Sequence, residues 1–98
     1  MSAGFPVRHD RAASRFVAEL PGGGGVLHYS EAGDSVIDLY HAEVDPALRG
    51  RGVAGALVTA ACEHARANGL RLIPTCPYVA WWFRRHPECR ELLFTPSD

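Results

Sequence analysis

The chain has 98 residues, of which 47% are hydrophobic and 21% charged, and its formal net charge at pH 7 is -1. These values are typical of one ordered domain over residues 1–98, and they argue against a disordered chain and against nucleic-acid binding. No apolar run reaches the roughly 20 residues that cross a bilayer, and the N-terminus lacks a signal pattern, so we expect a cytoplasmic protein without a membrane partner.

The first half of the chain predicts an antiparallel meander of β-strands. Residues 1–14 show no hydrophobic period, so we expect a loosely ordered lead-in. Three segments after it have the apolar content or alternation of strands, residues 15–20, 26–30 and 35–44. Pro21 with the glycine run 22–25 predicts a flexible turn, and residues 32–34 predict the next one. Short turns of this kind join neighbouring antiparallel strands.

The second half of the chain changes to a helical period. The glycine-rich segment 49–55 leads into a helix, predicted by apolar residues three and four apart, that ends near Asn68 with Gly69 as its C-terminal cap. Three shorter elements follow, a strand at residues 70–73, a helix at 78–86 ended by Pro87, and an edge strand at 92–94. The order predicts one α+β domain with a mixed, mostly antiparallel sheet and one long and one short helix.

The segment 44–54, VDPALRGRGVA, carries the strongest functional signal, because a strand ends there and a helix begins. The first N–H groups of a helix have no internal partner, and the macrodipole places partial positive charge at them. Gly50 and Gly52 let a ligand approach the backbone, and Arg49 and Arg51 add charge suited to phosphate oxygens. The segment therefore indicates a diphosphate site, with a solvated Arg-Gly turn as the alternative.

Residues 49–54, RGRGVA, match the pattern (Q/R)-x-x-G-x-(G/A) of the GNAT superfamily of N-acetyltransferases, which the chain resembles. The similarity extends to four further segments, HAEV at 41–44, ARANG at 65–69, PTCPY at 74–78 and HPE at 86–88. These segments look like the very short, single-domain GNAT-like proteins, in register over roughly residues 26–93. The resemblance implies the compact GNAT fold and acetyl-coenzyme A as the cosubstrate.

The resemblance also implies a place for each part of acetyl-coenzyme A. The strand ending at Val44 would lie beside the pantetheine arm, with the main chain of Val44 bonding its amides. The pyrophosphate would lie at the loop opened by Gly50, assisted by the Arg49 side chain and held by the backbone N–H groups of Arg51, Gly52, Val53 and Ala54. The thioester would sit where the strands ending at Val44 and Ile73 diverge.

The chain departs from the wider superfamily at two points. Many members carry a tyrosine general acid on the last helix, but Phe83 occupies that place here and has no proton to give. Tyr78 is the nearest phenol, and we count it among the cofactor-contacting residues. The N-terminal helices that usually shape the acceptor site are missing, so the amine would bind an open surface or a site completed by a partner subunit.

Three side chains are candidates for the chemistry. Cys76 precedes the second helix, where the helix dipole favours a reactive thiolate, so it could accept the acetyl group as a thioester before passing it to an amine. In the alternative interpretation Cys76 only lines the cofactor pocket and transfer is direct. Strand alternation places His41 and Glu43 on one face with Ile37 and Leu39, from which either could remove the proton of the amine.

A run of aromatic and basic residues fills the second predicted helix. Trp81, Trp82 and Phe83 look like a cofactor-binding box, but on so short a helix we expect them to be core anchors. Arg84 and Arg85 could contact an adenosine 3′-phosphate, although a solvated helix face is the simpler interpretation.

The cysteine and lysine content bears on the remaining classes of chemistry. The chain has no lysine, which excludes Schiff-base catalysis on a lysine and the P-loop lysine. The three cysteines, Cys62, Cys76 and Cys89, are few and odd in number, so we expect separate thiols rather than a disulfide framework. A zinc site that pairs Cys62 and His64 with His86 and Cys89 is the less favoured alternative, and we expect no metal.

Together these observations predict an acetyl-coenzyme A-dependent N-acetyltransferase, a transferase acting on a small-molecule or protein amine. Two alternatives stay open. The first is a non-catalytic acyl-coenzyme A-binding module, which Phe83 favours because the usual acid is absent. The second is a small interaction protein in which RGRG is only a turn. An oligomer that completes the acceptor site is compatible with each of them.

Overall fold

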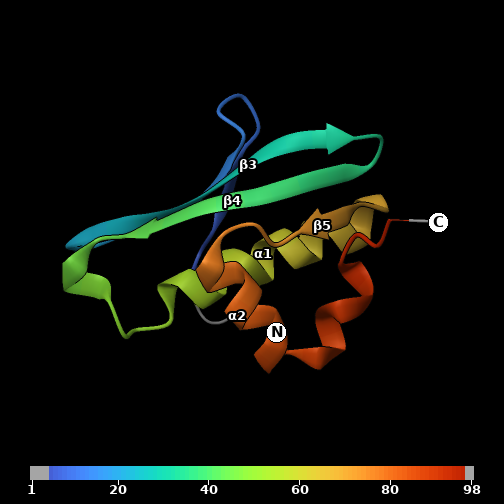
Figure 1. Ribbon diagram of the computed structural model, residues 1–98. Helices are drawn as coiled ribbons and strands as arrows, with labels where there is room; N and C mark the ends of the chain where they lie inside the picture. Colours follow the sequence, from blue (N-terminus) through green and yellow to red (C-terminus); the bar gives the residue numbers. More distant parts are fainter. Residues whose placement is uncertain (1–4, 97–98) are drawn as a thin grey trace.

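Within residues 5–96, the part of the chain that the computed structural model describes, a five-stranded β-sheet forms one layer and the helices cover one of its faces (Figure 1). The elements follow in the order β1 (Arg8–Asp10), β2 (Arg15–Leu20), β3 (Gly23–Gly33), β4 (Val36–Val44), η1 (Pro46–Leu48), α1 (Val53–Asn68), β5 (Arg71–Ile73), α2 (Pro77–Arg85) and η2 (Pro87–Leu92). The predicted α+β class with one long and one short α-helix is confirmed. The same range adds two short 3₁₀ helices, η1 and η2.

The strands lie in the order β1-β2-β3-β4-β5, so each one pairs with its neighbour in sequence. The first four are antiparallel, and β5 runs parallel to β4, where residues 36–38 oppose Arg71–Ile73. A parallel pair needs a crossover connection, which α1 supplies. The sheet is therefore mixed and mostly antiparallel, as predicted.

A β-bulge in β4 changes which residues share a face. His41 opposes His28 and Leu39 opposes Tyr29, so the intervening Tyr40 has no partner on β3. Because one extra residue shifts the alternation, Ile37 and Leu39 are buried under the helices while His41 and Glu43 are exposed. The prediction that all four share one face is wrong, although His41 and Glu43 still lie on the same side.

The glycine run is part of a strand rather than a flexible turn. Only Pro21 and Gly22 form the turn, and β3 begins at Gly23. A Cβ on Gly25 would lie 3.0 Å from Val53 Cγ1 and 3.2 Å from Leu57 Cδ1. Helix α1 thus packs directly on the β3 backbone, and glycine is required by this close approach rather than by flexibility.

The two ends of the chain differ from prediction. Strand β1 lies inside the expected loose lead-in and pairs with β2, and its three polar residues give no hydrophobic period that could have revealed it. The part of the lead-in at residues 1–4 lies outside the described residues. At the other end, the expected edge strand at 92–94 is reduced to one bridge between Leu72 and Leu93, because η2 continues to Leu92.

The core lies between the sheet and α1. Helix α1 ends at Asn68, and Gly69 caps it in the left-handed conformation at φ 67°, as predicted. Its apolar side meets β2, β3 and β4, and four leucines of this core are completely buried, Leu27, Leu39, Leu57 and Leu72. Helix α2 packs beside α1 on the same face of the sheet (Figure 1). None of the helices described between residues 5 and 96 is long and apolar enough to span a membrane.

Candidate functional site

Strand β4 loses its partner on one side where the sheet divides. Its pairing with β5 ends at Asp38, and the next link on that side is the backbone N–H of Cys76, which donates to Leu39 O at 2.9 Å. Among the described residues, the remainder of β4 up to Val44 pairs with β3 alone. The main chain of this part of β4 therefore presents an open edge beside the start of α1.

The N-terminus of α1 presents unpaired backbone amides. Gly50 and Gly52 have φ of 80° and 87°, and Gly52 is the N-cap without a side-chain cap. The first helical hydrogen bond runs from Ala56 N to Gly52 O at 3.0 Å, while Arg51 N donates to Leu48 O at 3.3 Å. Within residues 5–96 no atom accepts from the four amides between these two donors, those of Gly52, Val53, Ala54 and Gly55. We refer to these four N–H groups as the amide cradle.

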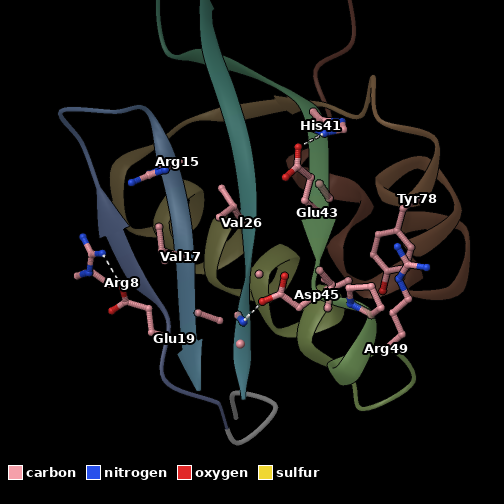
Figure 2. A pocket seen from close by; sticks show the side chains of 18 residues that line it. Arg8, Arg15, Val17, Glu19, Val26, His41, Glu43, Asp45, Arg49 and Tyr78 are labelled. Atoms are coloured by element: carbon pink, nitrogen blue, oxygen red, sulfur yellow. Dashed lines mark hydrogen bonds and ion pairs between the residues drawn. The ribbon is translucent and has the colours of Figure 1, made fainter. Parts of the chain in front are cut away.

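A cleft of about 930 Å³ connects the amide cradle to the open face of the sheet. Figure 2 shows Arg49 and Tyr78 at one end of this cleft and His41 with Glu43 further along β4. Its opposite wall comes from β2 and β3, where Arg15, Glu19 and Val26 point away from the helices. Of the four residues of the amide cradle, Ala54 lines this cleft, so one cavity borders the cradle and reaches His41 and Glu43.

Most charged groups of the cleft are already paired. His41 Nε2 lies 2.8 Å from Glu43 Oε2, and Arg8 Nη2 lies 3.6 Å from Glu19 Oε2. Asp45 Oδ2 accepts from Gly24 N at 2.7 Å. Between residues 5 and 96 no carboxylate lies in ion-pair contact with Arg49, so its charge is available to an anion at the cradle.

Tyr78 stands at the junction of α1 and α2. Its hydroxyl lies 3.6 Å from the position of a Cβ on Gly55, which places the phenol over the first turn of α1. Burial, with a further contribution from the charge of Cys76, raises the pKa of the Tyr78 hydroxyl above its usual 10.0. Tyr78 therefore stays protonated at neutral pH and can donate a hydrogen bond into the cleft.

Cys76 is close to the point where the sheet divides, but its thiol faces the core. The residue is the N-cap of α2, as the sequence predicts, and only 5% of its surface is exposed. It lines neither the large cleft nor the smaller one described next. The structure thus separates Cys76 from the surface that carries the other candidate residues.

A second, smaller cleft of about 350 Å³ lies on the α2 side of the amide cradle. Sequence reasoning placed Gly50, Gly52 and Val53 at this end of the site, and all three line this cleft. Trp81 lines it too and is 43% exposed, so the expectation that it anchors the core is wrong, whereas Trp82 is buried.

The structure brings together most of the predicted site residues. The large cleft collects His41, Glu43, Val44, Arg49, Ala54 and Tyr78, and the smaller cleft adds the glycines of the loop. Arg51 lines neither cleft, and its amide is used in the turn to Leu48. Sequence reasoning missed Arg15, Glu19 and Val26, which an outward-facing alternation in the first two strands could have indicated.

The three cysteines lie apart from this site or below its surface. Burial, and then the neighbouring Cys89, raises the pKa of the Cys62 thiol to about 12. Cys62 thus neighbours Cys89 rather than joining a larger ligand set. No group of three or more His, Cys, Asp or Glu side chains among residues 5–96 is arranged to hold a metal ion.

Comparison with known proteins gives a match to the family model of the GCN5-related N-acetyl-transferases over residues 15–92. The chain belongs to the GCN5-related N-acetyltransferase family. The matched range includes both walls of the large cleft, the amide cradle and α2. Membership confirms the resemblance seen in the sequence and supports acetyl transfer as the general activity of this family.

Named relatives agree with the family. Protein NATD1 of Bos taurus is 38% identical over 88 residues, which cover 86% of this chain and 78% of that protein. Protein NATD1 of Homo sapiens is 35% identical over 91 residues, covering 89% and 80%. The NMR structure of a GCN5-like protein of Staphylococcus aureus superimposes with a TM-score of 0.73. The match covers 97% of this chain and 93% of that protein at 20% identity, so the two share the fold.

Proposed function

We propose that the protein transfers an acetyl group from acetyl-coenzyme A to an amine. One observation carries this proposal: Arg49 and Ala54, beside the unpaired amides at the start of α1, line the same cleft as His41 and Glu43. An acyl donor with a diphosphate needs an anion site, and an amine acceptor needs a group that takes its proton. Both requirements are met at opposite ends of one cavity.

The residues present fit the parts of acetyl-coenzyme A. Its pyrophosphate suits the amide cradle and the Arg49 guanidinium, because backbone N–H groups and a helix N-terminus favour an anion. Its pantetheine amides suit the open edge of β4 near Val44, which lacks a strand partner. When bound, acetyl-coenzyme A supplies the thioester whose acetyl group is transferred.

We assign proton transfer to the His41–Glu43 pair. A protonated amine is no nucleophile, so it must lose a proton before it attacks the thioester carbonyl. His41 accepts this proton, and Glu43, 2.8 Å away, orients the ring and stabilises the imidazolium. The thiolate of coenzyme A is a better leaving group when a proton or hydrogen-bond donor is near its sulfur. Tyr78, the protonated phenol in the cleft, is the residue we assign to this role.

Direct transfer fits the position of Cys76 better than an acetyl-cysteine. Its thiol is almost fully buried, so an acetyl group on sulfur would have to enter the packed core. We therefore place Cys76 beneath the site as a packing residue. The acceptor in this proposal is an amine of a small molecule or of a protein.

A non-catalytic acyl-coenzyme A-binding module is the second candidate, and the position of Phe83 favours it. Phe83 is 2% exposed and belongs to the core, so it cannot supply the acid that many superfamily members use. The two candidates share the amide cradle and differ only in turnover. Release of free coenzyme A thiol from acetyl-coenzyme A over a panel of amines separates them, because a binding module releases none above the uncatalysed rate.

Ligand-induced stabilisation tests the binding that both candidates require. A ligand that binds only the native state raises the melting temperature, and the increase grows with ligand concentration. Coenzyme A at millimolar concentration should raise it clearly, while pantetheine, which lacks the diphosphate, should raise it much less. Equal responses to the two ligands would remove the cradle from the proposal, and no response to coenzyme A would remove the proposal itself.

A further inference from the structure

Helix α2 exposes one large aromatic side chain beside the amide cradle. Trp81 is 43% exposed, whereas the neighbouring Trp82 and Phe83 are 5% and 2% exposed. An indole this exposed loses a large part of the stabilisation that full burial gives such a side chain. Fold stability therefore explains Trp82 and Phe83 and leaves the position of Trp81 unexplained.

Trp81 is part of a row of side chains along one side of α2. Its ring centroid lies 5.6 Å from that of Tyr78, and the Arg85 guanidinium lies 5.3 Å from the indole centroid. The spacings of three and four residues place all three on the same helix side. Among residues 5–96 no carboxylate lies in ion-pair contact with Arg85, so the row ends in an unneutralised cation.

Two residues of this row, Tyr78 and Trp81, line a cleft at the cradle that His41 and Glu43 do not reach. Trp81 and Tyr78 line the cleft of about 350 Å³ together with Gly52, Val53 and Ala54, but His41 and Glu43 do not line it. A ligand whose diphosphate lies on the cradle therefore has room on both sides. Toward β4 it meets the proton-transfer pair, and toward α2 it meets a flat aromatic surface with a guanidinium.

The chemistry of that surface selects a nucleotide. An exposed indole face offers stacking to a planar heterocycle whatever its hydrogen-bonding edge, and an arginine offers bidentate bonds to a phosphate. We propose that Trp81 stacks on the adenine of coenzyme A and that Arg85 binds its 3′-phosphate. This inference rests on the proposed function, and it makes α2 the element that distinguishes coenzyme A from acyl carriers that end at phosphopantetheine.

Three ligands separate the contributions of the two residues. Coenzyme A carries the adenine and the 3′-phosphate, 3′-dephospho-coenzyme A lacks that phosphate, and 4′-phosphopantetheine lacks the whole nucleotide. Calorimetry should show that Trp81→Leu weakens binding of the first two ligands about tenfold and leaves the third unchanged. Arg85→Gln should weaken only coenzyme A, also by about tenfold. In wild type, coenzyme A should change the tryptophan fluorescence, and this change should disappear in Trp81→Leu.

Arg84→Gln is the matched control, because Arg84 neighbours Arg85 but no indole lies under its guanidinium among the described residues. It should bind all three ligands as wild type does. Since Trp81 and Arg85 are exposed, the unliganded melting temperatures of the variants should stay close to that of wild type. Wild-type affinity of Trp81→Leu for coenzyme A would overturn the inference and leave the cradle intact. If wild type bound none of the ligands, the proposed function itself would fail.

Discussion

The two ends of the large cleft are built from different parts of the chain. At the α1 end the groups available to a ligand are backbone amides, held in place by left-handed glycines and by the helix that follows them. At the β4 end they are the side chains of His41 and Glu43, on an exposed strand past a β-bulge. The backbone amides of the first end are suited to hold an anion but cannot transfer a proton. The side chains of the second end are suited to transfer a proton but offer no comparable anion site.

In the proposed function, this division assigns binding and chemistry to separate residues. A change at the cradle should alter affinity for coenzyme A and leave the chemical step alone, while a change at His41 or Glu43 should do the reverse. A substitution that altered both quantities equally would contradict the division. Mutant kinetics can detect it, because KM and kcat respond to different interactions.

The largest effect is expected from a carboxylate placed on the cradle itself. Gly52 adopts a left-handed φ, which Asp and Asn tolerate better than other side chains, and the nearest atom to a new Cβ is Phe5 Cε2 at 3.9 Å. Gly52→Asp should lower affinity for coenzyme A by about 100-fold or more, because the new carboxylate accepts from the amides and its charge repels the diphosphate. Calorimetric titration measures this loss.

Gly52→Asn is the control for the backbone strain, since it has the same shape without the charge. It should keep most of the affinity, and the unliganded melting temperatures of the two variants should agree within a few degrees. Equal loss in both variants would show that a side chain at this N-cap lowers the affinity by occupying the amides or straining the backbone, rather than by its negative charge.

At the other end of the cleft, Glu43→Gln should reduce kcat by about 100-fold and leave the affinity for coenzyme A unchanged. The amide keeps the size of the side chain but cannot stabilise a protonated His41. Glu19→Gln serves as the control, because Glu19 lines the same cleft but pairs with Arg8. A similar fall in kcat for both variants would point to the general charge of the cleft rather than to the His41–Glu43 pair.

The sequence predicted the α1 end of the large cleft better than the β4 end. The cradle follows from local rules, since glycine spacing, a strand end and a helix start all lie within residues 44–54. The face presented by His41 depends on the bulge at Tyr40, which no two-residue period can reveal. Strand β1 was not predicted for a similar reason. Its pairing with β2 makes it a strand, and its own residues carry no strand pattern.

Glycines 23–25 illustrate the same limit within the fold. A run of glycines predicts flexibility when read locally, yet here Gly25 lies directly against Val53 and Leu57 of α1. The contact joins residues far apart in sequence, so only the assembled structure shows why side chains are absent. Trp81 differs from Trp82 in the same way, because the packing of α2 decides which of the two indoles is buried.

A smaller effect is expected from Cys76→Ala, which tests the core placement of this thiol. Turnover should stay within about twofold of wild type, because direct transfer needs no thiol at this position. Mass spectrometry after incubation with acetyl-coenzyme A should find no acetyl group on Cys76. An adduct there, together with loss of turnover in the variant, would establish the covalent route and show that the thiol becomes accessible.

The smallest effect concerns pH and arises at the far end of α1. His9 and His64 lie with ring centroids 4.4 Å apart, and His9 Nε2 lies 2.6 Å from the Tyr29 hydroxyl. Burial lowers the pKa of both histidines below 6.5, assisted for His9 by the charge of His64 and for both by Arg11. Because the unfolded chain binds these protons first, the stabilisation is complete above pH 6.5 and is lost as pH falls through the lower folded-state pKa values.

The melting temperature should therefore decline between pH 7 and pH 5, and it should decline less in His64→Gln. The site should respond differently, because His64 lines neither of the clefts at the cradle. Affinity of His64→Gln for coenzyme A at pH 7 should equal that of wild type. If the variant lost stability on acidification as steeply as wild type, the titrating groups would lie elsewhere, and the His9–His64 contact would have no part in the pH dependence of the fold.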